Sequence, residues 1–443
     1  MTLKDVTHSG SREKVITEEE FLPVLEQAAS HLLELREVVR TGAGKEWSRR
    51  FVSHMIREVH GLRTLLNDHD SQENRTYSYF TEVVAGIRGF AKVVYILKHL
   101  RERFLRSHLA ENGEASRRFY KDTLNALAFC GDTLRSLFSA LLSECEALDI
   151  RLPSALASEA VVKDEDSELR KHLPHNIDEE EMAGEDAKVA QVAASFLRAA
   201  DLYATMAPPE KLETYLELKR FVQERLDEEK SRILESRIHA IQSKYDTYIQ
   251  FTASESRSPE LRQIRYVISL ALHLFEVTTH LIHFYERHEN DIRSESVKQR
   301  ISGIVNKRTV LDWAVNYAFR NAGWLMAEGK TTALRLIPEY TSIREVAFQI
   351  PHDVRLHIRP AALIAAIVNH HGTPVRMKMG DGECDAASVT DVIFLAGTNL
   401  DAREVTFSGD ERPLDDLATL FEVGLRDEGR DELEERLAYL KQR

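Results

Sequence analysis

The hydrophobic positions in the first three quarters of the chain recur at spacings of three and four residues. Stretches such as FLPVLEQAASHLLELREVV and VVAGIRGFAKVVYILKHL therefore predict amphipathic helices of bundle length between about Glu18 and Ile150. The polar clusters TGAGKE, NDHDSQENRT and ENGEAS separate these stretches and are typical of loops between helices. We expect residues 1–150 to form an antiparallel, all-α helical bundle.

A second helical region follows an interruption of this pattern. Residues 151–188 are rich in acidic side chains and contain prolines without a sustained apolar period, which is typical of a linker. The helical period then resumes, and we expect residues 189–338 to form the second half of the bundle. Short matches in the same order, such as RRFV at 49 and KRFV at 219, leave open whether the halves are a duplication.

The final quarter of the chain changes to the period of two that is typical of strands. REVAFQI, PVRMKMG and REVTFSG alternate apolar and polar positions and contain β-branched or aromatic residues, so they predict three strands. MGDGEC at 379–384 predicts a hairpin with an Asp-Gly turn. The predicted sheet is small and has helices on one face, as in an α+β open-faced sandwich.

Three helices accompany these strands, in the predicted order strand, helix, strand, strand, short helix, strand, helix. Residues 358–371 predict a helix with Pro360 in its first turn and Gly372 directly after its end. PLDDLATLFEVGL at 413–425 predicts a closing amphipathic helix with acidic residues in its first turn. We expect an α/β domain over residues 343–426, followed by a charged helix or tail over residues 427–443.

The composition narrows the class of protein. A net charge of -13 argues against general binding to nucleic acid or to an anionic membrane surface. The three cysteines are too few and too scattered for a disulfide framework or a zinc site. The N-terminal residues lack the apolar core of a secretory signal, and we find no window of the roughly 18 apolar residues that span a bilayer. We therefore expect a cytoplasmic protein that neither inserts into a membrane nor binds nucleic acid.

The segment VRLHIRPAALIAAIV places His357 and Arg359 where an extended stretch turns into a helix. With the later DAASVTDVIFLAG, it resembles the histidine-containing phosphocarrier (HPr) family of the bacterial sugar phosphotransferase system. The resemblance covers roughly residues 343–426, including the order of strands and helices. The family signature Gly-Leu-His-x-Arg-Pro-Ala is matched at Leu356, His357, Arg359, Pro360 and Ala361.

The resemblance implies that His357 accepts a phosphoryl group from an enzyme I-type donor charged by phosphoenolpyruvate and passes it to an acceptor. A neutral histidine ring nitrogen is a nucleophile near neutral pH. Free N–H groups of about Ile358 and Arg359, and the Arg359 guanidinium, would stabilise the phosphate. The implied binding residues for the partner proteins are Arg355, Ile358, Val389 and Ile393. We predict no cofactor and no metal, and expect a phosphoryl carrier rather than a stand-alone catalyst.

Several residues depart from the family pattern. The glycine that normally precedes Leu-His is Arg355, and the first helix carries Ala366 and Asn369 where basic docking residues are usual. Thr390 is polar in a stretch that is usually apolar. These departures predict that the donor or the partner differs from the usual one.

Ser388 matches a serine that a dedicated kinase phosphorylates in some HPr-like proteins, where the added charge impedes docking. The same serine forms an S-x-x-D pattern with Asp391, which is typical of the start of a helix. The sequence therefore suggests two roles for Ser388, a helix cap and a regulatory site.

The fused helical region is far larger than a carrier needs, which favours a regulatory protein whose helices respond to the phosphorylation state and bind a partner or a second copy. In one alternative, the HPr-like domain is an unphosphorylated docking module in a helical scaffold. In another, the helices form a metal-dependent enzyme, because Glu276, His280 and His283 share one helix face, with His273 one turn earlier. No P-loop, Rossmann glycine set or nucleophile elbow is present in the sequence.

Overall fold

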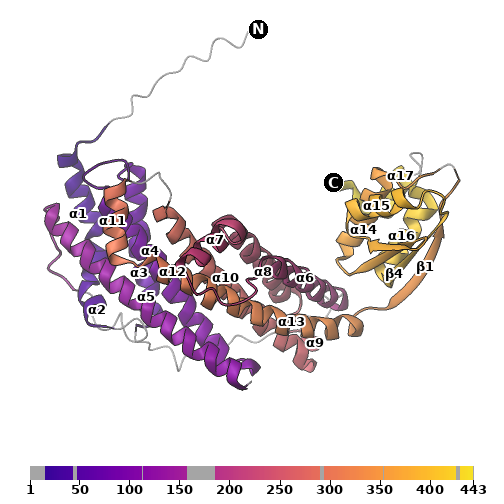
Figure 1. Cartoon of the computed structure of the whole chain (residues 1–443), viewed down its shortest axis with the longest axis horizontal. Helices are drawn as coiled ribbons and strands as arrows, with labels where there is room; N and C mark the ends of the chain where they lie inside the picture. The colour runs from indigo at the N-terminus through magenta and orange to yellow at the C-terminus, as the bar shows by residue number, and fades with distance from the viewer. Residues whose placement is uncertain are drawn as a thin grey trace, which may run out of the picture. The chain divides into compact units, whose positions relative to one another are not determined.

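The chain is mostly helical, with a small antiparallel sheet near its C-terminus (Figure 1). Most of the predicted acidic linker, residues 157–184, lies outside the residues that this computed structural model describes. The described residues are 15–42, 47–111, 113–156, 185–289, 294–352, 354–425 and 430–442.

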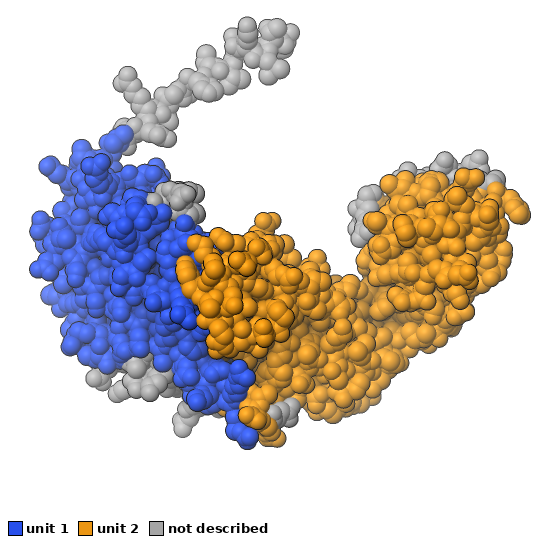
Figure 2. Space-filling view, in the orientation of Figure 1, with its two compact units in different colours: residues 1–102, 117–170, 280–313 blue, residues 103–116, 171–279, 314–443 orange. Residues whose placement is uncertain are grey.

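Two compact units make up the chain, and each is discontinuous in sequence (Figure 2). Unit 1 comprises residues 1–102, 117–170 and 280–313, and unit 2 comprises residues 103–116, 171–279 and 314–443. The long helix α10 (Pro259–Glu289) therefore contributes its first part to unit 2 and its last part to unit 1.

Unit 1 is helical, as the apolar period predicts. Its first helix begins with a capping box, in which the Thr17 hydroxyl accepts a hydrogen bond from the Glu20 N–H and the Glu20 carboxylate accepts one from the Thr17 N–H. Besides the last part of α10, the unit holds all or most of α1 (Glu18–Glu34), α2 (Arg36–Thr41), α3 (Arg49–Asp68), α4 (Ser78–Leu105), α5 (Gly113–Ala147), α11 (Glu295–Ile304) and α12 (Lys307–Asp312).

A buried ion pair joins α4 to the end of α10 inside unit 1. The Glu82 carboxylate accepts hydrogen bonds from Arg287 Nε at 2.8 Å and from Arg287 Nη2 at 2.7 Å. The His288 ring lies 3.4 Å from the same carboxylate, and Glu82 and His288 are each only 1% exposed. Burial alone would raise the pKa of Glu82, but the His288 and Arg287 side chains outweigh it and lower that pKa to about 2.

The helices of unit 2 pack around aromatic side chains. The Tyr203 hydroxyl donates a hydrogen bond to the Phe319 carbonyl at 3.1 Å, and the two rings lie 4.8 Å apart. Phe319 ends a π-helical segment, Trp313–Phe319, that runs directly into the next helix. The unit holds the first part of α10, together with α6 (Glu185–Met206), α7 (Tyr215–Arg225), α8 (Glu228–Tyr248), α9 (Ala253–Arg257) and α13 (Arg320–Glu339).

Helix α10 is long and apolar enough to cross a membrane by length and composition, contrary to the sequence expectation that no window reaches this limit. However, 78% of its most apolar window is buried inside the protein. Core helices of globular proteins have the same composition, so this helix is weak evidence for a membrane span.

The C-terminal part of unit 2 has the predicted order of strand, helix, strand, strand, helix, strand, helix. The sheet is antiparallel throughout, with the spatial order β1-β4-β2-β3. Its strands are β1 (Ile343–Gln349), β2 (Val375–Met379), β3 (Gly382–Asp385) and β4 (Glu404–Asp410), and its helices are α14 (Ile358–His371), α15 (Val389–Thr398) and α16 (Glu411–Thr419). We call this part the α/β domain.

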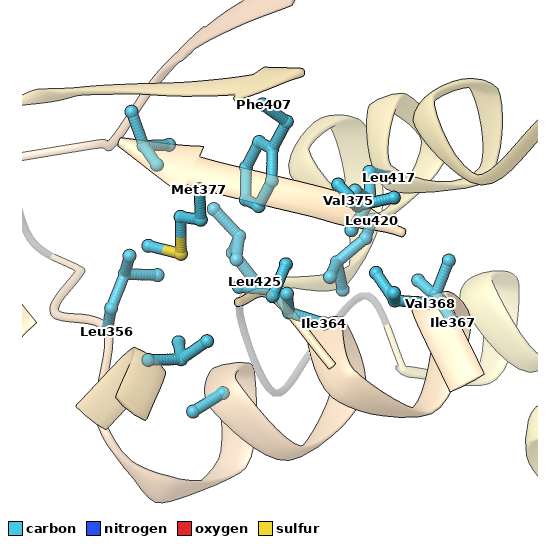
Figure 3. Packing of buried hydrophobic residues seen from close by; sticks show 14 of the residues in the cluster. Leu356, Ile364, Ile367, Val368, Val375, Met377, Phe407, Leu417, Leu420 and Leu425 are labelled. Atoms are coloured by element: carbon cyan, nitrogen blue, oxygen red, sulfur yellow. The ribbon is translucent and has the colours of Figure 1, made fainter. Parts of the chain in front are cut away.

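Alternation along β2 places one face of the sheet on a hydrophobic core. Met377 is fully buried, whereas its neighbours Arg376 and Lys378 are exposed. Met377 pairs with Phe407 of β4, and Figure 3 shows both side chains on the same side of the sheet as Ile364 of α14. The helices therefore cover this face, which confirms the predicted combination of a helical region and a small α/β domain.

The β2–β3 hairpin is present, but its predicted turn is displaced by one residue. Met379 pairs with Gly382, so Gly380 and Asp381 form the two-residue turn and Gly382 already belongs to β3. Gly380 has a φ of 60°, as a two-residue hairpin turn with glycine at its first central position requires. The expected Asp-Gly turn is wrong because the strand pairing selects the preceding glycine.

Gly372 ends α14 at the predicted position and adopts a left-handed φ of 71°. We expect Gly372→Ala to lower the free energy of unfolding of the α/β domain by about 1–2 kcal/mol, because a Cβ is disfavoured at this φ. Gly397 lies inside α15, and a Cβ added to it would have no neighbouring atom within 4 Å, so Gly397→Ala is a matched control. This control should leave stability unchanged or raise it slightly. Urea unfolding of both variants checks the prediction, and equal midpoints would contradict it.

The domain continues beyond its predicted closing helix. Helix α16 begins directly after β4 at Glu411, two residues earlier than predicted, and is followed by a π-helical turn, Leu420–Gly424. Two further short helices follow, α17 (Arg430–Arg436) and a 3-10 helix, Ala438–Gln442, which together we call the C-terminal segment. Three of its residues belong to the hydrophobic core of the α/β domain, namely Leu433, Leu437 and Leu440.

Candidate functional site

His357 is the N-cap residue of α14, and its ring is exposed to solvent. Its Nδ1 atom accepts a long hydrogen bond of 3.4 Å from the backbone N–H of Arg359. Leu356, directly before it, is buried in the domain core and holds the chain at the start of the helix. The side chain of His357 is thus open to solvent, and its Nδ1 faces a helix N–H group of the kind that binds anions.

Arg359 is partly buried in the first turn of α14. It lines a pocket of about 440 Å³ together with Val389, the first residue of α15. The structure therefore brings together the starts of the two helices that carry most of the predicted site residues. The walls of the pocket are largely apolar, and Arg359 and Glu434 bring charge to it.

The other predicted contact residues differ in accessibility. Arg355 is exposed, and Ile358 is 68% exposed, so both side chains are available to a partner. Ile393 instead packs partly buried against the core of the domain. The following residue, Phe394, is 73% exposed and was not among the predicted contacts. Helical spacing explains this, because Val392, Leu395 and Ala396 occupy the buried face of α15.

Ser388 is the N-cap residue of α15, and its hydroxyl accepts a hydrogen bond from the Asp391 N–H at 3.2 Å. The capping role predicted from the S-x-x-D pattern is therefore confirmed. The regulatory role remains a proposal. A phosphate on Ser388 would add negative charge at the edge of the pocket that Val389 lines.

We expect Ser388→Ala to lower the free energy of unfolding by about 1 kcal/mol, since the Asp391 N–H loses its acceptor. Ser388→Asp should retain most of that stability, because a carboxylate also caps a helix and interacts favourably with the helix dipole. Thermal unfolding of the two variants beside the parent tests this. A Ser388→Asp variant that is as unstable as Ser388→Ala would contradict the capping account.

A second polar cluster, missed in the sequence, lies at the other end of α14. The Asp416 carboxylate accepts a hydrogen bond from the Tyr439 hydroxyl at 2.6 Å and lies 2.7 Å from His371 Nε2. Burial would raise the pKa of Asp416, but these two partners outweigh it and leave that pKa below its ordinary value. His370 stacks on the Tyr439 ring with the centroids 3.6 Å apart. No local pattern signals this cluster, because its members come from three separate elements.

The metal-centre alternative finds little support in the described residues. His273 Nδ1 lies 2.8 Å from the Glu276 carboxylate, one turn along α10. The part of the chain that the structure describes contains no group of three or more histidine, cysteine or acidic residues placed to hold a metal ion. His280 and His283 share the helix with this pair but do not complete such a group.

The site as a whole combines an exposed imidazole, a helix N-terminus and a guanidinium two residues further on. This arrangement suits a nucleophile that must carry an anionic group and release it again. No family model, curated protein or solved structure matches the chain.

Proposed function

We propose that the α/β domain is an HPr-like phosphocarrier module and that His357 is its phosphoacceptor. The observation that carries this proposal is the position of His357, an exposed N-cap residue whose Nδ1 faces the Arg359 N–H within the matched Leu-His-x-Arg-Pro-Ala motif. An ordinary N-cap is most often serine, threonine, aspartate or asparagine, so a histidine here favours a chemical role.

In the proposed reaction, a lone pair of His357 Nδ1 attacks phosphorus on the charged donor. A bond between Nδ1 and phosphorus forms as the bond between phosphorus and the donor breaks, and the donor group keeps the electron pair. The phosphoryl oxygens then lie beside the backbone N–H groups of Ile358 and Arg359 at the start of α14, where the helix dipole favours negative charge. The guanidinium of Arg359 adds a positive charge two residues away.

The proposed role is regulatory. The helical region makes up most of the chain, whereas a carrier that only moves between enzymes needs none of it. Phosphorylation adds close to two negative charges at one surface position, which is enough to change a protein contact. We propose that the cytoplasmic protein binds an enzyme I-type donor and a regulated partner, which is either another protein or a second copy of this chain.

One observation favours the alternative of an unphosphorylated docking module. Asn369, at a position where basic docking residues are usual in the family, donates hydrogen bonds to the carbonyls of Ala365 and Ala387. Its side chain therefore ties α14 to the loop before α15 instead of presenting a charge to a donor. In this alternative the domain binds its partner without phosphate on His357.

The deciding experiment charges the full chain with phosphoenolpyruvate and enzyme I from the same organism. Intact mass before and after mild acid treatment then reports an acid-labile phosphoryl group. The donor must first be shown to phosphorylate an ordinary HPr in the same buffer. One phosphoryl group per chain supports the carrier, and an unmodified chain beside a fully charged HPr supports the docking module.

A further inference from the structure

We propose that the C-terminal segment, residues 430–442, is an autoinhibitory cover that must leave the outer face of α14 before a donor can reach His357. This inference rests on the proposed phosphocarrier function and concerns how access to that site is controlled. Figure 1 shows α17 on the same side of the α/β domain as α14 and α15.

The cover and α14 share the pocket described above. Arg359, Ala362 and Ala366 line it from α14, and Leu433 and Leu440 line it from the C-terminal segment. These α14 residues recur at three and four positions, so they form one stripe that starts two residues after His357. The segment therefore lies over a stripe of α14 that begins within one helical turn of the phosphoacceptor.

Specific contacts hold the segment in place at the far end of α14. The Tyr439 ring stacks on His370 at an interplanar angle of 3°, and its hydroxyl donates the 2.6 Å hydrogen bond to Asp416. Leu433 is only 1% exposed. The closed position is therefore a defined packing arrangement with its own hydrogen bond and apolar contacts.

A docked donor would compete with this segment for space. A standard protein interface buries about 800 Å² on each partner, which corresponds to a patch of roughly 16 Å radius. Ala366 lies nine residues after His357, a distance of about 13 Å along a helix that rises 1.5 Å per residue. A donor centred on His357 therefore covers the stripe that the C-terminal segment now occupies.

The segment depends on its tertiary contacts for its own structure. The segment consists of helices of 7 and 5 residues, which are too short to be stable without tertiary contacts. The pocket beneath it is about 440 Å³, so part of its apolar surface lacks packing partners. The ion pair between Arg436 of the segment and Glu422 involves two exposed side chains, so it contributes little to the stability of the closed position.

The charge of the segment suits such a cover. Glu432, Glu434 and Glu435 make α17 acidic, and Glu434 lines the same pocket as Arg359. A phosphoryl group on His357 would repel these carboxylates and compete for the guanidinium of Arg359. Once the donor has charged His357, the open state is therefore favoured over the closed one.

The test compares the initial rate of phosphoryl transfer from charged enzyme I to four full-length chains. Tyr439→Ala removes the stacking and the hydrogen bond, Leu440→Ser weakens the apolar contact, and Arg436→Ala is a control within the segment that does not line the pocket. We expect each of the first two variants to react at least about fivefold faster than the parent, the factor that corresponds to about 1 kcal/mol. The control should stay within twofold of the parent, about the effect of an exposed ion pair.

The outcomes separate the cover from the carrier. A parent that is phosphorylated, with both loosened variants no faster, overturns the cover and leaves the carrier standing. A complete lack of phosphate in all four chains, with a donor active on ordinary HPr, overturns the carrier and the cover with it. Faster transfer in both loosened variants supports both.

Hydrogen exchange decides the matter if either variant fails to fold. The Leu437 N–H donates to the Leu433 carbonyl and the Leu440 N–H to the Leu437 carbonyl, so both amides are protected in the closed state. In the parent, these amides should exchange faster when enzyme I and phosphoenolpyruvate are present. Unchanged protection in a chain that carries phosphate overturns the cover.

Discussion

Replacing His357 by alanine should abolish phosphoryl incorporation from charged enzyme I, because the chain loses the proposed phosphoacceptor at the start of α14. His352→Ala is the matched control, since His352 is also exposed and lies five residues earlier in the same domain. The control should be charged at the rate of the parent. Intact mass of all three proteins, taken over the first minutes of reaction, gives the comparison.

Arg359→Ala should slow this reaction without abolishing it. A hydrogen bond to a charged group contributes about 1.5–3 kcal/mol, so the rate should fall roughly 10- to 150-fold. Because Arg359 donates its backbone N–H to Nδ1 whatever its side chain, the helix cap survives the substitution.

Equal charging of His357→Ala and the parent would place the phosphate on another residue and exclude the proposed site.

Replacing Glu82 by glutamine should cause the largest loss of stability among the substitutions considered. The variant keeps the size of the side chain but leaves the partly buried Arg287 guanidinium without its counter-charge. Breaking a buried ion pair in this way costs roughly 3–5 kcal/mol. Urea unfolding, followed by the circular dichroism of the helices, measures the change.

Glu37→Gln is the control for this substitution. Glu37 pairs with Arg40 on the surface of α2, so its replacement should leave the unfolding midpoint unchanged. A similar midpoint for Glu82→Gln and Glu37→Gln would show that the buried pair contributes little to the stability of unit 1.

The same carboxylate predicts how stability depends on pH. Glu82 titrates near its ordinary pKa of 4.5 in the unfolded chain and at about 2 in the folded protein. Its contribution is therefore fully present above pH 4.5 and is lost progressively as the pH falls toward 2. This shift corresponds to about 3 kcal/mol, so the stability difference between the parent and Glu82→Gln should narrow between pH 5 and pH 3.

The helix bounds, turns and caps of the α/β domain were predicted correctly only where a local sequence pattern specifies them. The bounds of α14 were predicted correctly because Pro360 and Gly372 mark its two ends within the local sequence. The hairpin turn was displaced because two overlapping candidate turns, Gly380-Asp381 and Asp381-Gly382, have similar local preferences and only strand pairing distinguishes them. The capping role of Ser388 was predicted from a pattern only four residues long.

Some features of the candidate site were likewise predictable from the local sequence, and others were not. The motif around His357 and Arg359 identifies a chemical possibility from contiguous residues. The exposure of Phe394, the cover formed by the C-terminal segment and the Tyr439–Asp416 hydrogen bond were not foreseen. Each depends on which face of an element packs inward, a property that several chain segments decide together.

The sequence by itself determined most of the secondary structure of this protein and the residues of its candidate site. Apolar periods, helix caps and turn glycines act within a few residues, so their consequences are local and can be predicted. Only the tertiary structure decided that Glu82 meets Arg287, 205 residues away, and that residues 430–442 lie over α14. Such contacts depend on how distant segments exclude water from a shared surface, and no local pattern encodes that choice.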